Sequence, residues 1–197
     1  DENLLYKETL DQCELADQVG FHNLWFVEHH FLTTFSSSPC PEVIFGALSR
    51  LTKRIRLGTS VLLVNLRNPL VLARTLSSLD YLSNGRVITG VSLGGRPEEY
   101  LAAGVEMKSR VTRFIETLEV MCNVWGHKSG ADNLRLFQAP GEDALPGPAQ
   151  RRIPLWIGGM AAPVLERVAT LRDGWLASST TTADEFARGW AKIQGLA

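Results

Sequence analysis

The sequence predicts an α/β fold built on a parallel β-sheet, and three observations carry this prediction. Short apolar runs alternate with segments of helical periodicity through the whole chain, which is the pattern of βαβ units. The apolar runs are nearly continuous, as in parallel strands that are buried on both faces. Two of them end in paired glycines followed by a helix start. These patterns fit either a doubly wound sheet or part of an eight-stranded barrel.

Local signals set the bounds of each element. Residues 3–19 carry apolar side chains at helical spacing, and Gly20 ends that helix as a C-terminal cap. Pro41 and Pro69 each suit the first turn of a following helix. The helix that begins at Pro69 ends near the turn signal at 83–85. The expected strands are 24–27, 55–64, 87–93, 154–159 and 174–178, and the expected helices are 3–19, 41–51, 69–83, 109–125, 161–171 and 182–193, with a short helix after 94–99.

Composition indicates one soluble globular domain over residues 1–197. The chain has 197 residues, of which 45% are hydrophobic, enough for a sizeable core. A formal net charge of -1 gives no electrostatic footprint for nucleic acid or for an acidic membrane. No apolar run approaches the ~20 residues that span a bilayer, and we expect no signal peptide. Cys13, Cys40 and Cys122 are widely spaced, so a reducing cytoplasm is the expected location.

Residues 127–152 interrupt the alternation of strands and helices. This polar stretch holds six of the chain's Gly and Pro residues and shows no clear periodicity. At that length it is either a functional excursion or a poorly ordered, irregular insertion.

The triplet Glu28-His29-His30 follows the apolar run 24–27, at a strand carboxyl end where α/β folds place their chemistry. Side-chain alternation would put Glu28 and His30 on one face and His29 on the other. A strand that stops at Val27 would instead let all three approach one pocket. An imidazole titrates near pH ~6.5 and can serve as an acid, a base or an anion partner. Histidines that cap backbone groups explain the pair equally well, whereas a metal site is disfavoured because adjacent residues rarely converge on one ion.

Glycine turns and hydroxyl groups mark further stretches. Gly94-Gly95 and Gly158-Gly159 each join a strand to a helix, where backbone N–H groups favour an anion, although the Gly-x-Gly-x-x-Gly spacing is missing. The Gly-Thr-Ser sequence at 58–60 indicates a bulge or a close backbone approach, and a small-residue strand packed under a bulky helix is the alternative. Five hydroxyl residues at 178–182 suit a loop and an N-cap for the last helix, and a phosphate or ribityl contact is the alternative.

Seven segments, in order, resemble the bacterial luciferase-like monooxygenase family, which comprises flavin- or deazaflavin-dependent oxidoreductases built on an eight-stranded TIM barrel. Each segment is modest alone, but together they extend over nearly the whole chain. The resemblance implies a TIM-barrel fold with its cofactor at the carboxyl ends of the strands. The matching segments are 14–21 (ELADQVGF), 24–31 (LWFVEHHF), 53–59 (KRIRLGT), 79–86 (LDYLSNGR), 90–95 (GVSLGG), 154–159 (PLWIGG) and 173–175 (DGW).

The resemblance also implies roles for particular residues. His29 matches a histidine that assists oxygen or proton chemistry beside the flavin ring, with Glu28 as its neighbour. Ser60-Val61 falls where family members carry a non-prolyl cis peptide that supports the isoalloxazine ring. The turns at Gly94-Gly95 and Gly158-Gly159 would line the cofactor pocket. A phosphate-contacting helix start is matched by Gly159, Met160 and Ala161.

Two departures from the family pattern leave the cofactor open between FMN and a deazaflavin. Members often carry serine where this chain has Met160 and Ala161, so a phosphate contact there would rely on backbone N–H groups. An arginine that some flavin-binding members carry after the third strand is replaced by Leu93. The paired glycines that follow are also seen in deazaflavin-dependent relatives.

Five expected strands against eight in the family barrel imply a fragment or a natural truncation at both ends, holding about the second to the sixth strand. The expected activity is monooxygenation of a small organic substrate with reduced flavin and dioxygen. A deazaflavin-dependent hydride transfer and a non-catalytic flavin-binding fragment are the alternatives. Family members are commonly dimers, which makes a homodimer an expectation here.

Overall fold

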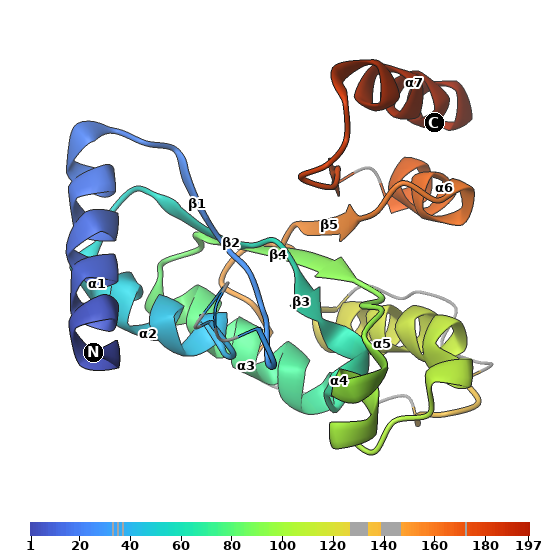
Figure 1. The fold of residues 1–197 in the computed structure, drawn as a ribbon, viewed down its shortest axis with the longest axis horizontal. Coiled ribbons are helices and arrows are strands. Elements are labelled where there is room, and N and C mark those ends of the chain that lie inside the picture. The colour runs from blue at the N-terminus through green and yellow to red at the C-terminus, as the bar shows by residue number, and fades with distance from the viewer. Residues whose placement is uncertain (33, 35, 37, 127–133, 139–146, 172) are drawn as a thin grey trace.

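The computed structural model (Figure 1) describes residues 1–32, 34, 36, 38–126, 134–138, 147–171 and 173–197. All pairings in its sheet are parallel, and the strands follow the order β1-β2-β4-β5-β6, with β3 also paired to β4. Neighbours in the sheet are thus neighbours in the chain, as in successive strands of a barrel. The predicted α/β barrel type is confirmed as a half-barrel. The strands are β1 (Asn23–Phe26), β2 (Arg56–Thr59), β3 (Leu62–Leu63), β4 (Val87–Ser92), β5 (Leu155–Gly158) and β6 (Gly174–Leu176).

Helices cover the outer face of this sheet. Neighbouring helices pack on one another: α1 on α2, α2 on α3, α3 on α5, and α6 on α7. Figure 1 shows α1, α2, α3 and α5 along one side of the strands and α6 and α7 beyond β5. No helix in the described parts of the chain is long and apolar enough to cross a bilayer. The helices are α1 (Glu2–Val19), α2 (Pro41–Leu51), α3 (Pro69–Leu82), α4 (Pro97–Ala102), α5 (Arg110–Val124), α6 (Ala162–Leu171) and α7 (Ala183–Leu196), with 3-10 turns η1 (Val64–Leu66) and η2 (Met107–Ser109).

The helix ends follow the predicted signals. Gly20 adopts φ 93° and donates its N–H to carbonyls of the last turn of α1. Pro41 and Pro69 begin α2 and α3, and Asn68 caps α3 through its side chain. Thr182 closes a capping box with Glu185 at the start of α7, which confirms the expected N-cap among the hydroxyl residues at 178–182.

Side-chain alternation sorts the strand residues between two layers. Leu57, Val87 and Leu155 face the helices and belong to the main core. Trp25 and Trp156 lie on the opposite, inner face, where their ring centroids are 5.1 Å apart. Glycine makes room for one of these rings, because a Cβ on Gly58 would stand 2.5 Å from Cε3 of Trp25. The indoles therefore fill the middle of the half-barrel.

Buried polar groups hold the amino ends of the strands. The Asp17 carboxylate accepts hydrogen bonds from the backbone N–H groups of Lys53, Arg54 and Ile55 at 2.9, 2.9 and 2.6 Å. Burial alone would raise the pKa of Asp17, but these hydrogen bonds lower it below the ordinary value. The buried Arg86 donates to carbonyls at the end of α2 and before β2. This end of the sheet is built for stability.

The predicted continuous strand 55–64 is wrong at its centre. Leu57 pairs with Val87 and Leu62 with Val91, so five steps along the β2–β3 stretch match four steps along β4. The extra residue is a bulge, as one interpretation of the Gly-Thr-Ser sequence predicted. The Thr59 hydroxyl bridges the break, donating to the Gly90 carbonyl at 2.8 Å and accepting from its N–H at 2.9 Å.

Two described pieces of the predicted insertion, 134–138 and 147–152, form neither helix nor strand. The first is tied to α5, because the buried Glu116 carboxylate accepts hydrogen bonds from the N–H groups of Arg135 and Leu136. The second is tied to α3 through Gln150, whose N–H donates to Asp80 at 2.8 Å. Residues 127–133 and 139–146 of the predicted insertion lie outside the described residues.

Candidate functional site

Glu28 is the centre of a buried polar cluster just past β1. Its side chain is 1% exposed. Oε2 accepts the backbone N–H of Leu63 in β3 at 2.7 Å. Oε1 accepts a hydrogen bond from Arg67 Nη2 at 2.7 Å and lies 2.9 Å from His30 Nε2. The carboxylate thus joins the end of β1 to the strand segment beyond the bulge.

Arg67 carries the balancing charge. It follows η1 and pairs with Glu28 and with Glu42 in the first turn of α2. Burial alone would lower the pKa of Arg67, but the charge of Glu28 and the hydrogen bonds to both carboxylates raise it above its ordinary value. Arg67 therefore stays cationic and serves as an electrostatic tie between three chain segments.

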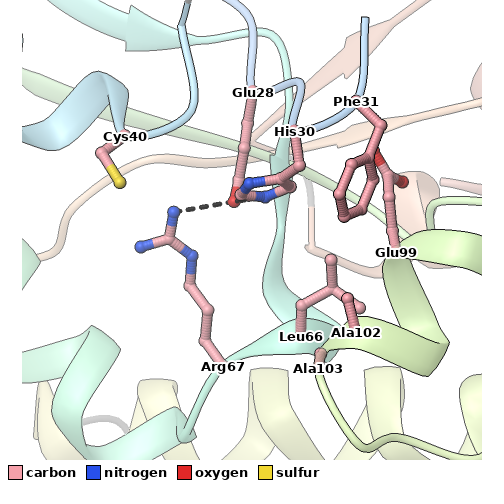
Figure 2. A pocket seen from close by; sticks show the side chains of 9 residues that line it. All are labelled: Glu28, His30, Phe31, Cys40, Leu66, Arg67, Glu99, Ala102 and Ala103. Carbon is pink, nitrogen blue, oxygen red and sulfur yellow. Dashed lines mark hydrogen bonds and ion pairs between the residues drawn. The ribbon is translucent and has the colours of Figure 1, made fainter.

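A cavity of about 340 Å³ opens beside this ion pair (Figure 2). Glu28 and His30 reach it together, although β1 ends at Phe26 and both residues lie beyond the strand. His29 is half-buried, its N–H donates to the Ser38 carbonyl at 3.0 Å, and it is not among the residues that line the cavity. His29 therefore does not line this cavity together with the other two residues of the triplet. The lining residues are Glu28, His30, Phe31, Cys40, Leu66, Arg67, Glu99, Ala102 and Ala103.

A second surface lies on the inner face, at the carboxyl ends of the strands. The peptide between Ser60 and Val61 is cis, as the family resemblance implied. Both residues are partly exposed, as are Ser92 and Gly158, whereas the neighbouring strand residues of β2 and β4 are buried. Val61 packs directly against Gly158 in β5, because a Cβ on Gly158 would stand 2.9 Å from Cγ1 of Val61. We call Ser60, Val61, Ser92 and Gly158 the inner edge.

The paired glycines flank the inner edge. Gly94 has φ +69°, and the Leu63 side chain fills the space where its side chain would be, because a Cβ on Gly94 would stand 3.1 Å from Leu63. Gly95 is exposed, and a Cβ there would meet nothing within 4 Å. Gly159 has φ +130° and its carbonyl accepts the indole N–H of Trp175 at 2.7 Å. Of these three glycines, Gly95 therefore leaves its backbone open to close approach by a flat ligand.

Met160 and Ala161 lead into α6. The Ala161 carbonyl accepts the N–H groups of Val164 and Leu165 at 2.8 and 3.2 Å, so the chain turns into the helix here. Neither residue carries a hydroxyl group. An anion at this helix start would be held by backbone N–H groups.

Sequence reasoning missed Arg67, Glu99 and Cys40. Glu98-Glu99 follows Pro97 as acids commonly do in the first turn of a helix, so nothing marked Glu99 as different. Burial and the charge of Glu42 raise the pKa of the Cys40 thiol, which disfavours a thiolate nucleophile there. Within the described ranges no three His, Cys, Asp or Glu side chains gather as a metal-binding group.

Comparison with known proteins places this geometry in a family. The model of the luciferase-like monooxygenase family matches residues 3–197. The oxygenase component of a flavin-dependent trigonelline monooxygenase from Acinetobacter baylyi is 31% identical over 156 residues, 78% of this chain and 43% of that protein. The crystal structure of monooxygenase RslO1 from Streptomyces bottropensis superposes with a TM-score of 0.88 at 27% identity, over 97% of this chain and 59% of that one. An F420-dependent secondary alcohol dehydrogenase shares the fold, with a TM-score of 0.73 at 20% identity, over 96% of this chain and 61% of its own. This chain, which spans roughly two fifths to three fifths of the length of these proteins, belongs to the luciferase-like monooxygenase family.

Proposed function

We propose that this chain carries the cofactor-facing edge of a flavin-dependent oxidoreductase that uses reduced flavin and dioxygen to oxidise a small organic substrate. One observation carries the proposal: Ser60, Val61, Ser92 and Gly158 stay partly exposed at the carboxyl ends of strands whose other residues are mostly buried. Active sites of TIM barrels lie at that end of the strands. Family membership makes a flavin or a deazaflavin the cofactor to test.

The residues of the inner edge fit a flat, largely apolar ring. Val61 offers a methyl surface, and the exposed Gly95 offers backbone with open space where a side chain would stand. When bound, such a cofactor supplies the electrons for the reduction of dioxygen or of the substrate. The protein would supply orientation and proton handling. A cofactor phosphate would depend on the backbone N–H groups of the turn at 159–161.

We assign proton transfer to His29 and positioning to Glu28. Phe26 and Glu28 turn toward the helices, since Phe26 packs on Phe45 and Glu28 binds Arg67. His29 lies between Glu28 and His30, which both line the cavity on the helix side, and this supports its approach to the inner edge. Glu28 already accepts hydrogen bonds from Leu63 and Arg67 and contacts His30, so its carboxylate is committed to holding the end of β1.

Hydride transfer with a deazaflavin is the second candidate. It is favoured by Leu93 and the paired glycines Gly94-Gly95, which leave the turn after β4 without a cationic side chain of its own to meet a phosphate. Arg96, the next residue, is paired with Glu98.

A fluorescence titration of the purified chain with FMN and with a deazaflavin tests the proposal. We expect one cofactor to be quenched, and Gly95→Leu to weaken its binding about tenfold by filling the approach to the backbone. Gly46→Leu in α2 is the matched control, because a Cβ on Gly46 also meets nothing within 4 Å. Quenching of neither cofactor would refute the proposal.

The role of His29 has its own readout. His29→Ala should leave cofactor affinity within about twofold while lowering oxygen consumption by about 10²–10⁴, the usual contribution of a positioned acid or base. Unchanged oxygen consumption in a variant that binds the cofactor would remove His29 from the mechanism. Cofactor binding without any oxygen consumption in the unmodified chain would leave only deazaflavin-dependent hydride transfer or a binding role.

A further inference from the structure

We propose that Asn65 and Tyr100 are positioning residues, which hold the turn at 93–95 in the conformation in which its backbone receives the cofactor. Both side chains bind the carbonyl group of Leu93, directly before the paired glycines. The inference rests on the proposed function, because the exposed Gly95 is part of the surface assigned to the cofactor. Asn65 and Tyr100 act on that surface only through the backbone that they hold.

Asn65 is a fully buried polar residue in η1. Its Nδ2 lies within hydrogen-bond distance of three acceptors, which are Tyr100 Oη at 2.8 Å, the Arg110 carbonyl at 3.0 Å and the Leu93 carbonyl at 3.2 Å. Its Oδ1 has no partner in the described part of the chain, so every polar contact of this side chain passes through Nδ2. Arg113 Nε donates to the Asn65 backbone carbonyl at 2.6 Å. Asn65 is therefore anchored on α5 and reaches from there to the turn after β4.

Tyr100 reaches the same carbonyl from α4. Its side chain is buried, and its hydroxyl donates to the Leu93 carbonyl while it accepts from Asn65 Nδ2. A hydroxyl can do both at once, and a carbonyl oxygen has two lone pairs for two donors. Tyr100 and Asn65 thus occupy the Leu93 carbonyl together. Because Tyr100 lies seven residues beyond Leu93, its hydrogen bond also closes the loop that begins at the turn.

The turn needs this support because two successive glycines give its backbone wide conformational freedom. Gly94 adopts φ +69°, and its N–H donates to Ser92 Oγ at 3.2 Å, a contact between near neighbours. The Leu93 carbonyl is instead held by side chains 28 and 7 residues away, which fix the turn relative to η1 and α4. A backbone that is ordered before a ligand arrives loses less entropy on binding, and this raises the affinity.

NMR order parameters of the backbone N–H groups, measured without cofactor, test whether the two side chains hold the turn. Tyr100→Phe removes only the hydroxyl and leaves Asn65 Nδ2 two carbonyl acceptors, so this variant should fold. The order parameter of Gly95 should fall from ~0.85, the value of a rigid backbone, toward ~0.6, while that of Leu57 in β2 stays unchanged. Asn65→Ala should lower it further, and Tyr100→Phe decides the test if Asn65→Ala does not fold. An unchanged Gly95 in folded Tyr100→Phe would overturn the inference.

Cofactor affinity separates positioning from general stability. Tyr100→Phe should weaken the cofactor that the unmodified chain binds by about fivefold, the effect of one hydrogen bond. Thr182→Ala is the matched control, because it also removes a side-chain hydroxyl but lies at the start of α7, which packs on α6. Its cofactor affinity should stay unchanged at a similar fall in the urea midpoint.

Two results of this titration would overturn the inference: unchanged affinity in Tyr100→Phe, or an equal loss of affinity in Thr182→Ala. Binding of neither cofactor by the unmodified chain would refute the proposed function instead. The order parameter of Gly95 would then still decide whether Asn65 and Tyr100 hold the turn, because it is measured without cofactor.

Discussion

Replacing Glu28 by Gln removes the charge at the end of β1 while keeping the shape of the side chain. The carboxylate accepts hydrogen bonds from Leu63 N–H and Arg67 Nη2, each at 2.7 Å, and contacts His30 Nε2 at 2.9 Å. In a glutamine side chain, one of the two carboxylate oxygens is replaced by an NH2 group, which would face a hydrogen-bond donor instead of accepting from it. Hydrogen bonds to a charged group are worth ~1.5–3 kcal/mol each, and breaking a buried ion pair costs ~3–5 kcal/mol. Because Arg67 keeps Glu42, we expect the lower end, about 3 kcal/mol.

Urea unfolding followed by tryptophan fluorescence and circular dichroism measures this loss. With a slope of ~2 kcal/mol/M, the midpoint of Glu28→Gln should fall by about 1.5 M while the slope stays the same. Glu98→Gln is the control, because its ion pair with Arg96 is exposed and screened by solvent, so that its loss should leave the midpoint nearly unchanged.

His29→Ala completes the comparison. We expect it to lower the free energy of unfolding less than Glu28→Gln does, because we assign His29 a role in proton transfer and not in stability. A loss of unfolding free energy below about 1 kcal/mol in Glu28→Gln would refute the positioning role of this carboxylate, because removing one partner of a buried ion pair costs more than that. An equal loss in His29→Ala would contradict the division of roles between the two residues.

Three further substitutions probe the scaffold. Asp17→Asn should cost ~2–4 kcal/mol at neutral pH, measured by urea unfolding. Because the folded-state pKa of Asp17 is lowered, its contribution is present above the unfolded value of ~3.9 and is lost as pH falls through the lower folded value, so the gap between the two proteins should close in acid. Gly90→Ala should prevent folding, with a loss above ~4 kcal/mol or no soluble protein, because a Cβ would overlap the Thr59 carbonyl oxygen. Thr182→Ala should cost about 1 kcal/mol by removing the cap of α7, and an unchanged thermal midpoint would contradict the capping box.

Most of the fold could be predicted from sequence because its signals are local. Pro41, Pro69 and Gly20 each restrict the backbone at one residue, and they mark true helix ends. The strands were found as apolar runs, since buried parallel strands need no alternation. The bulge was indicated by Gly-Thr-Ser but not located, because its position depends on the register against β4.

The site could be predicted only in part, because its contacts are distant in sequence. Arg67 lies 39 residues from Glu28 and 25 from Glu42, and no periodic pattern encodes such pairs. Glu99 resembles any acid in a first helical turn until its burial is known. The resemblance to family members supplied the cis peptide at Ser60-Val61, which composition and spacing could not supply.

The bond from Glu28 to the Leu63 amide gives the protein a built-in spectroscopic reporter. An amide in a sheet usually exchanges with solvent when its ladder opens, whereas this one donates to the side chain of a residue just past β1. The hydrogen-exchange rate of the Leu63 amide therefore reports whether the Glu28 carboxylate is hydrogen-bonded to it, even while the sheet stays intact. The Leu57 amide donates to the Arg86 carbonyl at 2.9 Å and serves as the reference. Faster exchange at Leu63 alone would report local opening around Glu28, whereas faster exchange at both amides would report unfolding of the sheet.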